Sequence, residues 1–126
     1  MSDEITLTLP RVREFVRIAH LVLGGLAVRL DLTFENLEDL QLALAGLLDR
    51  PDGEGFVTLA VRVEDRTLYA RVGPFDDSLQ AELEREPEEG VGLRRVLETV
   101  VDRIDLGSRE GGTWIELTKS VQGVER

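Results

Sequence analysis

Two glycines separated by one residue, Gly90 and Gly92, precede a segment with the apolar spacing of a helix that begins near Leu93. A helix N-terminus carries unpaired backbone N–H groups and a partial positive charge, so it can bind phosphate or another anion. The same glycines also suit a flexible entry to an ordinary helix that binds nothing. Taken alone, this segment leaves both interpretations open, and the choice depends on the elements around it.

The cysteine, histidine and acidic content of the chain limits the kinds of catalytic and metal site that it can form. The chain has no cysteine, which excludes disulfides, thiolate metal sites and cysteine nucleophiles. His20 is the single histidine, and it lies in an apolar helical segment without a paired serine or cysteine motif, so we expect it to pack rather than to catalyse. The acidic run 82–89 lacks the ordered oxygen spacing of a calcium loop. We therefore expect no metal site.

Composition points to a soluble globular protein. The 126 residues are enough for one domain, which we assign to 1–126. A net charge of −10 argues against nucleic acid as a direct partner and favours proteins with basic surfaces. The start of the chain lacks the features of a signal peptide, and the longest apolar run, 18–28, is too short to span a bilayer. We expect a cytoplasmic protein that makes no membrane contact.

Hydrophobic periodicity predicts the element order β, α, α, β, β, loop, α, β, β. Thr33 is the expected N-cap of the second helix, Trp114 is expected to pack within the last strand, and the tail after Lys119 is expected to fray. The acidic stretch 76–89 is predicted to be a mobile, solvated loop, with a short helix as the alternative. The expected strands are 5–9, 56–63, 67–72, one beginning at 104, and 113–118, and the expected helices are 11–30, 34–49 and 93–103.

Helices that are segregated from hairpin-connected strands imply one sheet covered on one face. The predicted fold class is therefore α+β, a two-layer α/β sandwich with a mixed, mostly antiparallel sheet and helices on one face.

This layout and four local sequences together resemble the GHKL (histidine kinase-like) ATPase superfamily, whose fold is the Bergerat fold. The similarity is greatest to its anti-sigma-factor serine kinase branch. The four sequences are LEDLQLAL (37–44), GPFD (73–76), GVGL (90–93) and Gly112-Thr113 before the last strand. They resemble the approach to the second family helix, a shortened glycine turn, the second glycine box and the closing Gly-Thr motif. The resemblance implies a nucleotide-site remnant at Gly73, Gly90, Gly92, Leu93 and Thr113.

The same resemblance implies that the catalytic residues are missing. In the family, the second helix carries a Glu that acts as general base and, four residues later, an Asn that coordinates Mg²⁺. The corresponding positions here are Gly46 and Arg50, and neither can do that chemistry. A one-residue slip of the alignment gives Ala45 and Asp49, which still lacks the base. We therefore expect no catalytic residues.

Two further features argue against phosphate chemistry. The family Asp that contacts adenine aligns with Arg71, whose guanidinium has only donors. The segment 76–89, at the position of the family's nucleotide lid, carries seven acidic residues and one arginine. Such a lid would repel a triphosphate. We therefore expect no cofactor, with ATP and Mg²⁺ bound only if the protein is an active kinase.

The sequence thus predicts a non-catalytic, anti-sigma-factor-like or partner-switching regulator. The resemblance implies a homodimer whose partner is a sigma factor or an anti-anti-sigma domain. The alternative is an active or ATP-binding serine protein kinase of the anti-sigma-factor type with rearranged nucleotide boxes. A third interpretation is a sensor that binds another small ligand in the vacated pocket. No specific residue of the sequence supports it.

Overall fold

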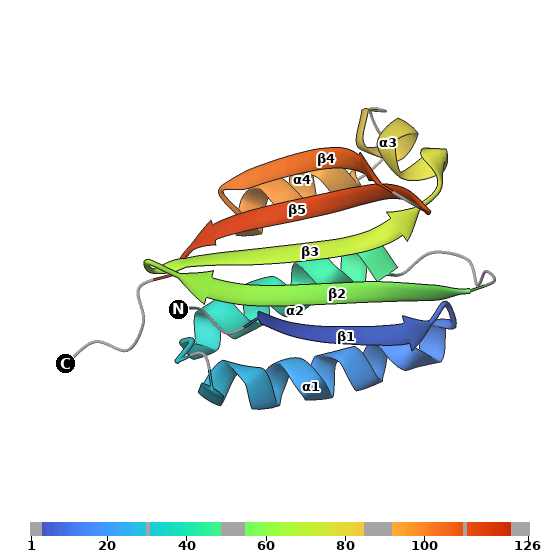
Figure 1. Cartoon of the computed structure of the whole chain (residues 1–126). Helices are drawn as coiled ribbons and strands as arrows, with labels where there is room; N and C mark the ends of the chain where they lie inside the picture. Colours follow the sequence, from blue (N-terminus) through green and yellow to red (C-terminus); the bar gives the residue numbers. More distant parts are fainter. Residues whose placement is uncertain (1–3, 30, 49–54, 85–91, 110, 122–126) are drawn as a thin grey trace.

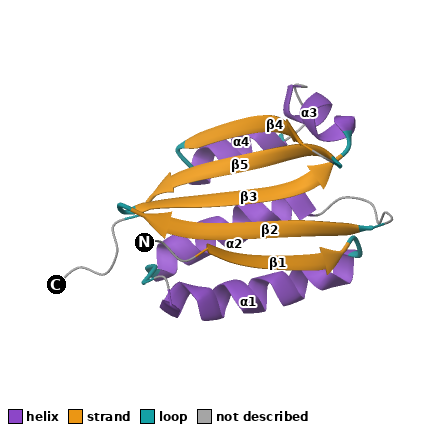
Figure 2. Ribbon diagram, viewed as in Figure 1, coloured by secondary structure: helices purple, strands orange, loops and turns teal. Residues whose placement is uncertain are grey.

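A computed structural model describes residues 4–29, 31–48, 55–84, 92–109 and 111–121. In these residues one sheet is covered on one face by helices (Figures 1 and 2). The elements are β1 (Glu4–Pro10), η1 (Arg13–Phe15), α1 (Val16–Arg29), α2 (Phe34–Leu48), β2 (Phe56–Glu64), β3 (Thr67–Phe75), α3 (Asp77–Glu84), α4 (Leu93–Val100), β4 (Arg103–Arg109) and β5 (Gly112–Ser120). The predicted two-layer α+β sandwich is confirmed.

The strands lie in the order β1-β2-β3-β5-β4, and each described pair is antiparallel. The sheet of the described strands is therefore more regular than the mixed sheet that we expected. The predicted hairpin between β2 and β3 is confirmed, and its two turn residues, Asp65 and Arg66, both have positive φ. None of the described helices is long and apolar enough to cross a membrane.

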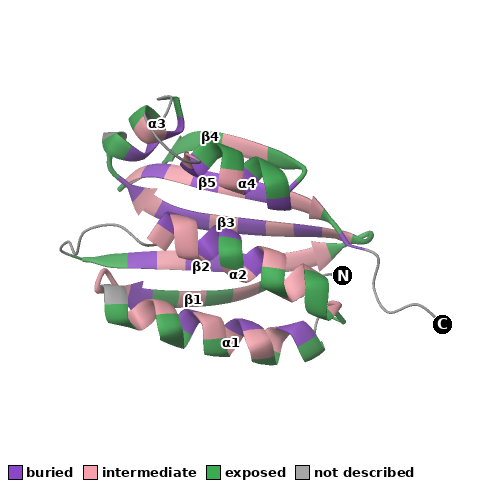
Figure 3. Ribbon diagram, turned by 180° about the vertical axis from the view of Figure 1, so that it is seen from behind, coloured by how far each residue is buried: buried purple, intermediate pink, exposed green. Residues whose placement is uncertain are grey.

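Side chains alternate along the strands between a face that packs on the helices and an open face. The helix-facing side chains are apolar and mostly buried, and they meet the buried stripes of α1, α2 and α4. Figure 3 views this helix layer from the side opposite to Figure 1. The strand residues at the centre of this core are Leu9, Leu59, Val61, Leu68, Ala70, Val72, Ile115 and Leu117.

Two polar contacts set the positions of the first two helices. The backbone N–H of Asn36 donates to Oγ1 of Thr33 at 3.1 Å, which confirms Thr33 as the N-cap of α2. The side-chain amide of Gln41 donates to the carbonyl oxygen of His20 at 3.2 Å and joins α2 to α1. His20 is half-buried, and its Nε2 is buried without a hydrogen-bond partner among the described residues. This placement fits a packing role.

The acidic segment after β3 differs from the predicted loop. Residues 77–84 form α3, and Leu79 and Leu83, four residues apart, are both fully buried. Of the two alternatives, the short helix forms here, because two leucines on one helix face supply enough apolar contact to fix it. Asp76 Oδ1 accepts a hydrogen bond from the Ser78 N–H at 3.0 Å, as an N-cap does. Residues 85–89 lie outside the described residues.

Three predicted boundaries also change. β3 continues through Gly73, Pro74 and Phe75, where we expected a turn, with a register shift in its pairing to β5 and a cis peptide bond before Pro74. α4 ends at Val100 instead of 103. The chain after Lys119 remains packed as far as Val121, which is buried and donates its N–H to the Arg66 carbonyl at 2.9 Å.

Candidate functional site

The candidate site begins where α4 packs on α2. Gly46 lies at the contact, and a Cβ atom placed on it would come within 3.0 Å of the Leu93 Cδ1. Most side chains larger than hydrogen would require Leu93 to move, so the glycine lets the first turn of α4 approach α2 closely. The structure thus brings together two sequence-predicted residues, Gly46 and Leu93. It fills the position next to Gly46 with an apolar side chain.

Gly92 is the N-cap of α4 and has extended backbone angles, φ −75° and ψ 165°, with no side-chain cap. Its carbonyl accepts the first bond of the helix from the Val96 N–H at 3.1 Å. Arg94 and Arg95 in the first turn are exposed, and Arg94 Nε bonds to Glu98 Oε2 at 3.1 Å along the same helix. Gly90 lies outside the described residues. Anion binding at this N-terminus therefore stays a prediction.

Gly73 and Thr113, the other predicted remnants, lie near the same end of β3 and β5. They face opposite sides of the sheet. Thr113 is on the buried side that includes Ile115, whereas a Cβ on Gly73 would come within 2.5 Å of the Trp114 ring on the open side. Gly73 therefore serves the packing of Trp114, and only Thr113 of this pair faces the helix layer.

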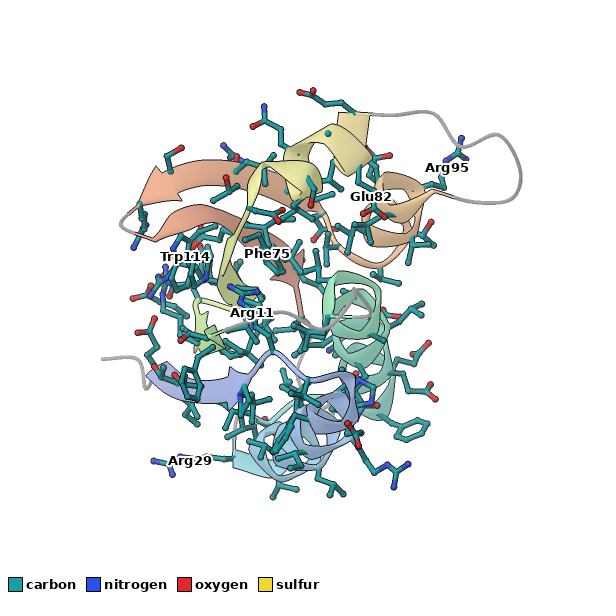
Figure 4. All side chains as sticks on the ribbon, turned by 90° about the vertical axis from the view of Figure 1, so that its right-hand side faces the viewer. Arg11, Arg29, Phe75, Glu82, Arg95 and Trp114 are labelled. Carbon is teal, nitrogen blue, oxygen red and sulfur yellow. The ribbon has the colours of Figure 1, made fainter. Side chains whose placement is uncertain are left out.

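Arg11 is a residue of this region that sequence reasoning missed. Its guanidinium donates to the Pro74 carbonyl and lies 5.9 Å from the centroid of the Phe75 ring. Figure 4 shows Arg11 beside Phe75, with Trp114 farther out on the sheet side. The only signal was its position directly after the first predicted strand, which does not reveal a partner more than sixty residues away in the sequence.

Arg71 does not occupy the place that the alignment implied. It alternates with the buried Ala70 and Val72 on β3, so its side chain lies on the open face of the sheet. Arg71 Nη2 lies 3.9 Å from Glu4 Oε2, and the cross-strand neighbour of Arg71 on β5 is Glu116. The residue next to it that faces the helices is Ala70, which cannot bind a nucleobase by hydrogen bonds either.

A second missed feature lies at the other end of α4. Lys119 Nζ is 3.0 Å from Asp39 Oδ2 and donates to the Val100 carbonyl oxygen at 2.9 Å. Lys119 thus binds an orphan carbonyl at the C-terminus of α4, where a positive charge is favourable. It also engages Asp39, an acidic residue on the side of α2 toward α4. The role of this lysine is structural.

The described residues include only part of the expected Mg-ATP site. The expected base position is Gly46, and the space beside it is filled by Leu93. Among the described residues there is also no group of three acidic, histidine or cysteine side chains that could hold a metal ion. Arg50, at the expected Mg²⁺-ligand position, lies outside the described residues, as does Asp49.

The antiparallel sheet, the helix layer and the glycine-bounded α4 before a Gly-Thr strand define a sandwich of the histidine kinase-like ATPase class. A solved structure agrees: that of the RsbU and RsbW domains of Rv1364c from Mycobacterium tuberculosis matches with a TM-score of 0.73 and 16% identity. The match covers 98% of this chain and 34% of that one, so the present chain spans about a third of its length.

Sequence comparison identifies the family. The serine-protein kinase RsbW of Listeria monocytogenes serovar 1/2a is 33% identical over 88% of this chain and 83% of the relative. RsbW of Bacillus mycoides is 27% identical over 95% of this chain and 86% of the relative. No family model matches the chain. The chain belongs to the family of the serine-protein kinase RsbW, and the predicted resemblance is confirmed.

Proposed function

We propose that this chain is a non-catalytic member of the RsbW family that regulates transcription by binding a protein partner. The observation that carries the proposal is the contact between Gly46 and Leu93. A general base must reach the proton that it removes, and this position has no carboxylate and is crowded by the Leu93 side chain. With no base at position 46, we expect the chain to bind a partner without transferring a phosphoryl group to it.

The partner that we propose is a sigma factor or an anti-anti-sigma domain, as the resemblance implies. The net charge of −10 supports the sigma factor, because DNA-binding surfaces are basic and a strongly acidic protein is complementary to them. Sequestering that surface would keep the sigma factor from DNA. The homodimer implied by the resemblance is part of the same proposal, and light scattering of the purified chain tests it.

The direct test is co-purification with the sigma factors encoded in the same genome. We expect one of them to be retained at low ionic strength and released as salt rises, since screening weakens contacts between exposed charges. Failure to retain any sigma factor at low salt would contradict the proposal.

A second candidate function is a serine protein kinase, which the names of the relatives favour. Calorimetry with Mg-ATP separates the two candidates, followed by transfer of labelled γ-phosphate to an anti-anti-sigma domain. We expect no detectable heat and no label transfer. Micromolar binding with transfer would establish the kinase and overturn the non-catalytic proposal.

A further inference from the structure

The face of the sheet that the helices leave open carries the single tyrosine and the single tryptophan of the chain. Tyr69 lies between the buried Leu68 and Ala70 on β3, so its side chain points to this open face, and Trp114 is on the same side. The strands lie in front of the helices in Figure 1, so that view looks onto the open face, and Figure 4 shows Trp114 on the side away from the helices. Tyrosine, tryptophan and arginine are the residue types enriched where proteins meet.

Two arginines of the open face lie along its surface and are held there. The guanidinium of Arg62 is 4.2 Å from the centroid of the Tyr69 ring, and its Nε is 3.9 Å from Glu64 Oε1. The Arg71 side chain is only 25% exposed, with its Nη2 3.9 Å from Glu4 Oε2. Side chains that are already ordered lose less conformational entropy when a second molecule covers them. The open face is therefore suited to association.

Charge distinguishes the open face from the rest of the molecule. The strand residues that point to it include as many acidic as basic side chains, so the face has no net charge, whereas the whole chain has a net charge of −10. The acidic residues are Glu4, Glu64, Asp105 and Glu116, and the basic residues are Arg62, Arg71, Arg103 and Arg109. The excess of acidic groups therefore does not oppose contact between two copies through this face.

A two-fold axis makes two open faces complementary to each other. Arg71 on β3 and Glu116 on the adjacent β5 are cross-strand neighbours near the middle of the sheet. When two copies stack face to face about an axis that runs along the sheet between these strands, the β3 of each copy lies over the β5 of the other. Arg71 of each copy then faces Glu116 of the other, and this contact occurs twice, as in any two-fold interface. The two Trp114 rings, each covering its own Gly73, come to lie on the two sides of the axis.

The remaining charges and the area of the face fit a dimer of moderate affinity. Arg62 and Arg103 approach each other across this axis, but each is already paired within its own copy, with Glu64 and Asp105 respectively. Four overlapping strands, about 4.8 Å apart and about 25 Å long, present roughly 480 Å² on each copy, or about 1,000 Å² in total. This area is at the lower limit for a specific interface, so we expect the dimer to dissociate in the micromolar range.

We propose that the open face of the sheet is the interface between two copies of this chain, with Arg71 of each copy paired to Glu116 of the other and Trp114 buried beside the axis. Sheets stack face to face in this way, about 10 Å apart, in β-sandwiches. This inference rests on the homodimer of the proposed function and deepens it, since it names the surface and the residues that pair. It leaves the helix layer free for another protein.

Charge complementation tests this pairing. Arg71→Glu places two carboxylates opposite each other at each contact, and Glu116→Arg places two guanidinium groups there, so either variant alone should raise the dissociation constant of the dimer about tenfold or more. In an equimolar mixture of the two variants, each introduced carboxylate faces an introduced guanidinium, and the two native groups face each other. A heterodimer should therefore form. Sedimentation velocity of the full chain at low ionic strength measures the mass of each variant and of the mixture.

Matched controls make the same changes of charge on the other side of the molecule. Arg17→Glu on α1 and Glu38→Arg on α2 alter exposed side chains of the helix layer, and each should leave the dimer unchanged. Circular dichroism shows whether each variant is folded. If a charge reversal unfolds the chain, Arg71→Gln and Glu116→Gln replace it, and each should raise the dissociation constant about threefold.

A dimer of unchanged affinity in the Arg71 and Glu116 variants would overturn the proposal, because another surface would then join the copies. So would variants that lose the dimer alone and do not recover it when they are mixed. A chain that stays monomeric at every concentration would refute both this interface and the homodimer, whereas retention of a sigma factor would still support the regulatory function. If no sigma factor is retained but the mixture restores the dimer, the interface stands without that partner.

Discussion

Lys119 and Asp39 form an ion pair between the sheet and the helix layer, with 3.0 Å between Nζ and Oδ2. The same ammonium group donates to the Val100 carbonyl at 2.9 Å, so one mostly buried side chain joins β5, α2 and the end of α4. α4 is a helix of eight residues, too short to be stable alone. Its position therefore depends on contacts of this kind.

We predict that Lys119→Met lowers the free energy of unfolding by about 2 kcal/mol, because it leaves Asp39 and the Val100 carbonyl without their partner. The loss should fall below that of a fully buried pair since Asp39 is partly exposed and can be rehydrated. Urea denaturation followed by circular dichroism measures it. Arg94→Met, which breaks the exposed pair with Glu98, is the control and should change stability by no more than about 0.5 kcal/mol. Similar losses in both variants would refute the structural role of Lys119.

Gly73 should tolerate no side chain because the Trp114 ring packs against it, whereas Gly107 has open space around its Cβ. Gly73→Ala would put a methyl group within 2.5 Å of the Trp114 ring, and we predict a loss of about 2 kcal/mol or more from overpacking. Gly107→Ala, on the edge strand β4 with nothing within 4 Å of its Cβ, should be neutral or slightly stabilising. Thermal denaturation of the two variants checks the difference. An unaffected Gly73→Ala variant would mean that Trp114 can leave its place at little cost.

Gly46 and Leu93 should be energetically coupled. In the unsubstituted chain, Gly46→Ala gains helix propensity of about 1 kcal/mol but crowds Leu93, so the net change should be small. In a Leu93→Ala background the crowding is gone, and the same substitution should stabilise by about 1 kcal/mol. A double-mutant cycle in urea yields the coupling. Additive effects would show that α4 does not press on Gly46.

The buried leucines of α3 should anchor that helix. Leu79→Ala and Leu83→Ala are each predicted to cost about 2–4 kcal/mol, because both side chains are fully buried. Gln80→Ala, on the exposed side, should be close to neutral. Hydrogen exchange provides a local readout, since loss of an anchor should raise exchange in residues 77–84 first. If both leucine variants retain full stability, the original expectation of a solvated segment regains support.

How far the sequence predicts the structure depends on the length of the pattern. α1, α2 and the β2–β3 hairpin follow from long periodic runs, and Thr33 is recognisable from its place before a helix. α3 was expected only as an alternative to a loop because its acidic residues outweigh Leu79 and Leu83, although the two leucines have helical spacing. Alternation along β3 was itself enough to show that Arg71 and Ala70 face opposite sides.

For the candidate site, the sequence gives the residue types but not the contacts between them. The sequence shows that position 46 is glycine, but the approach of Leu93 depends on the packing of helices that are distant in the chain. The pairs Lys119–Asp39 and Arg11–Pro74 are likewise tertiary, and no local pattern reports them. Contacts of this kind follow from the fold and not from spacing.

Trp114 is the single tryptophan of the chain, and it lies on the side of the sheet that the helices leave open. The tryptophan emission of the protein therefore comes from one indole whose Nε1 is buried without a hydrogen-bond partner among the described residues. Unfolding of the sheet will change that emission, whereas a molecule bound to α1 and α2 will leave the surroundings of the ring intact. A change in the Trp114 emission on adding a partner would thus indicate binding at the sheet. A partner that binds without changing this emission would instead be expected to contact the helices.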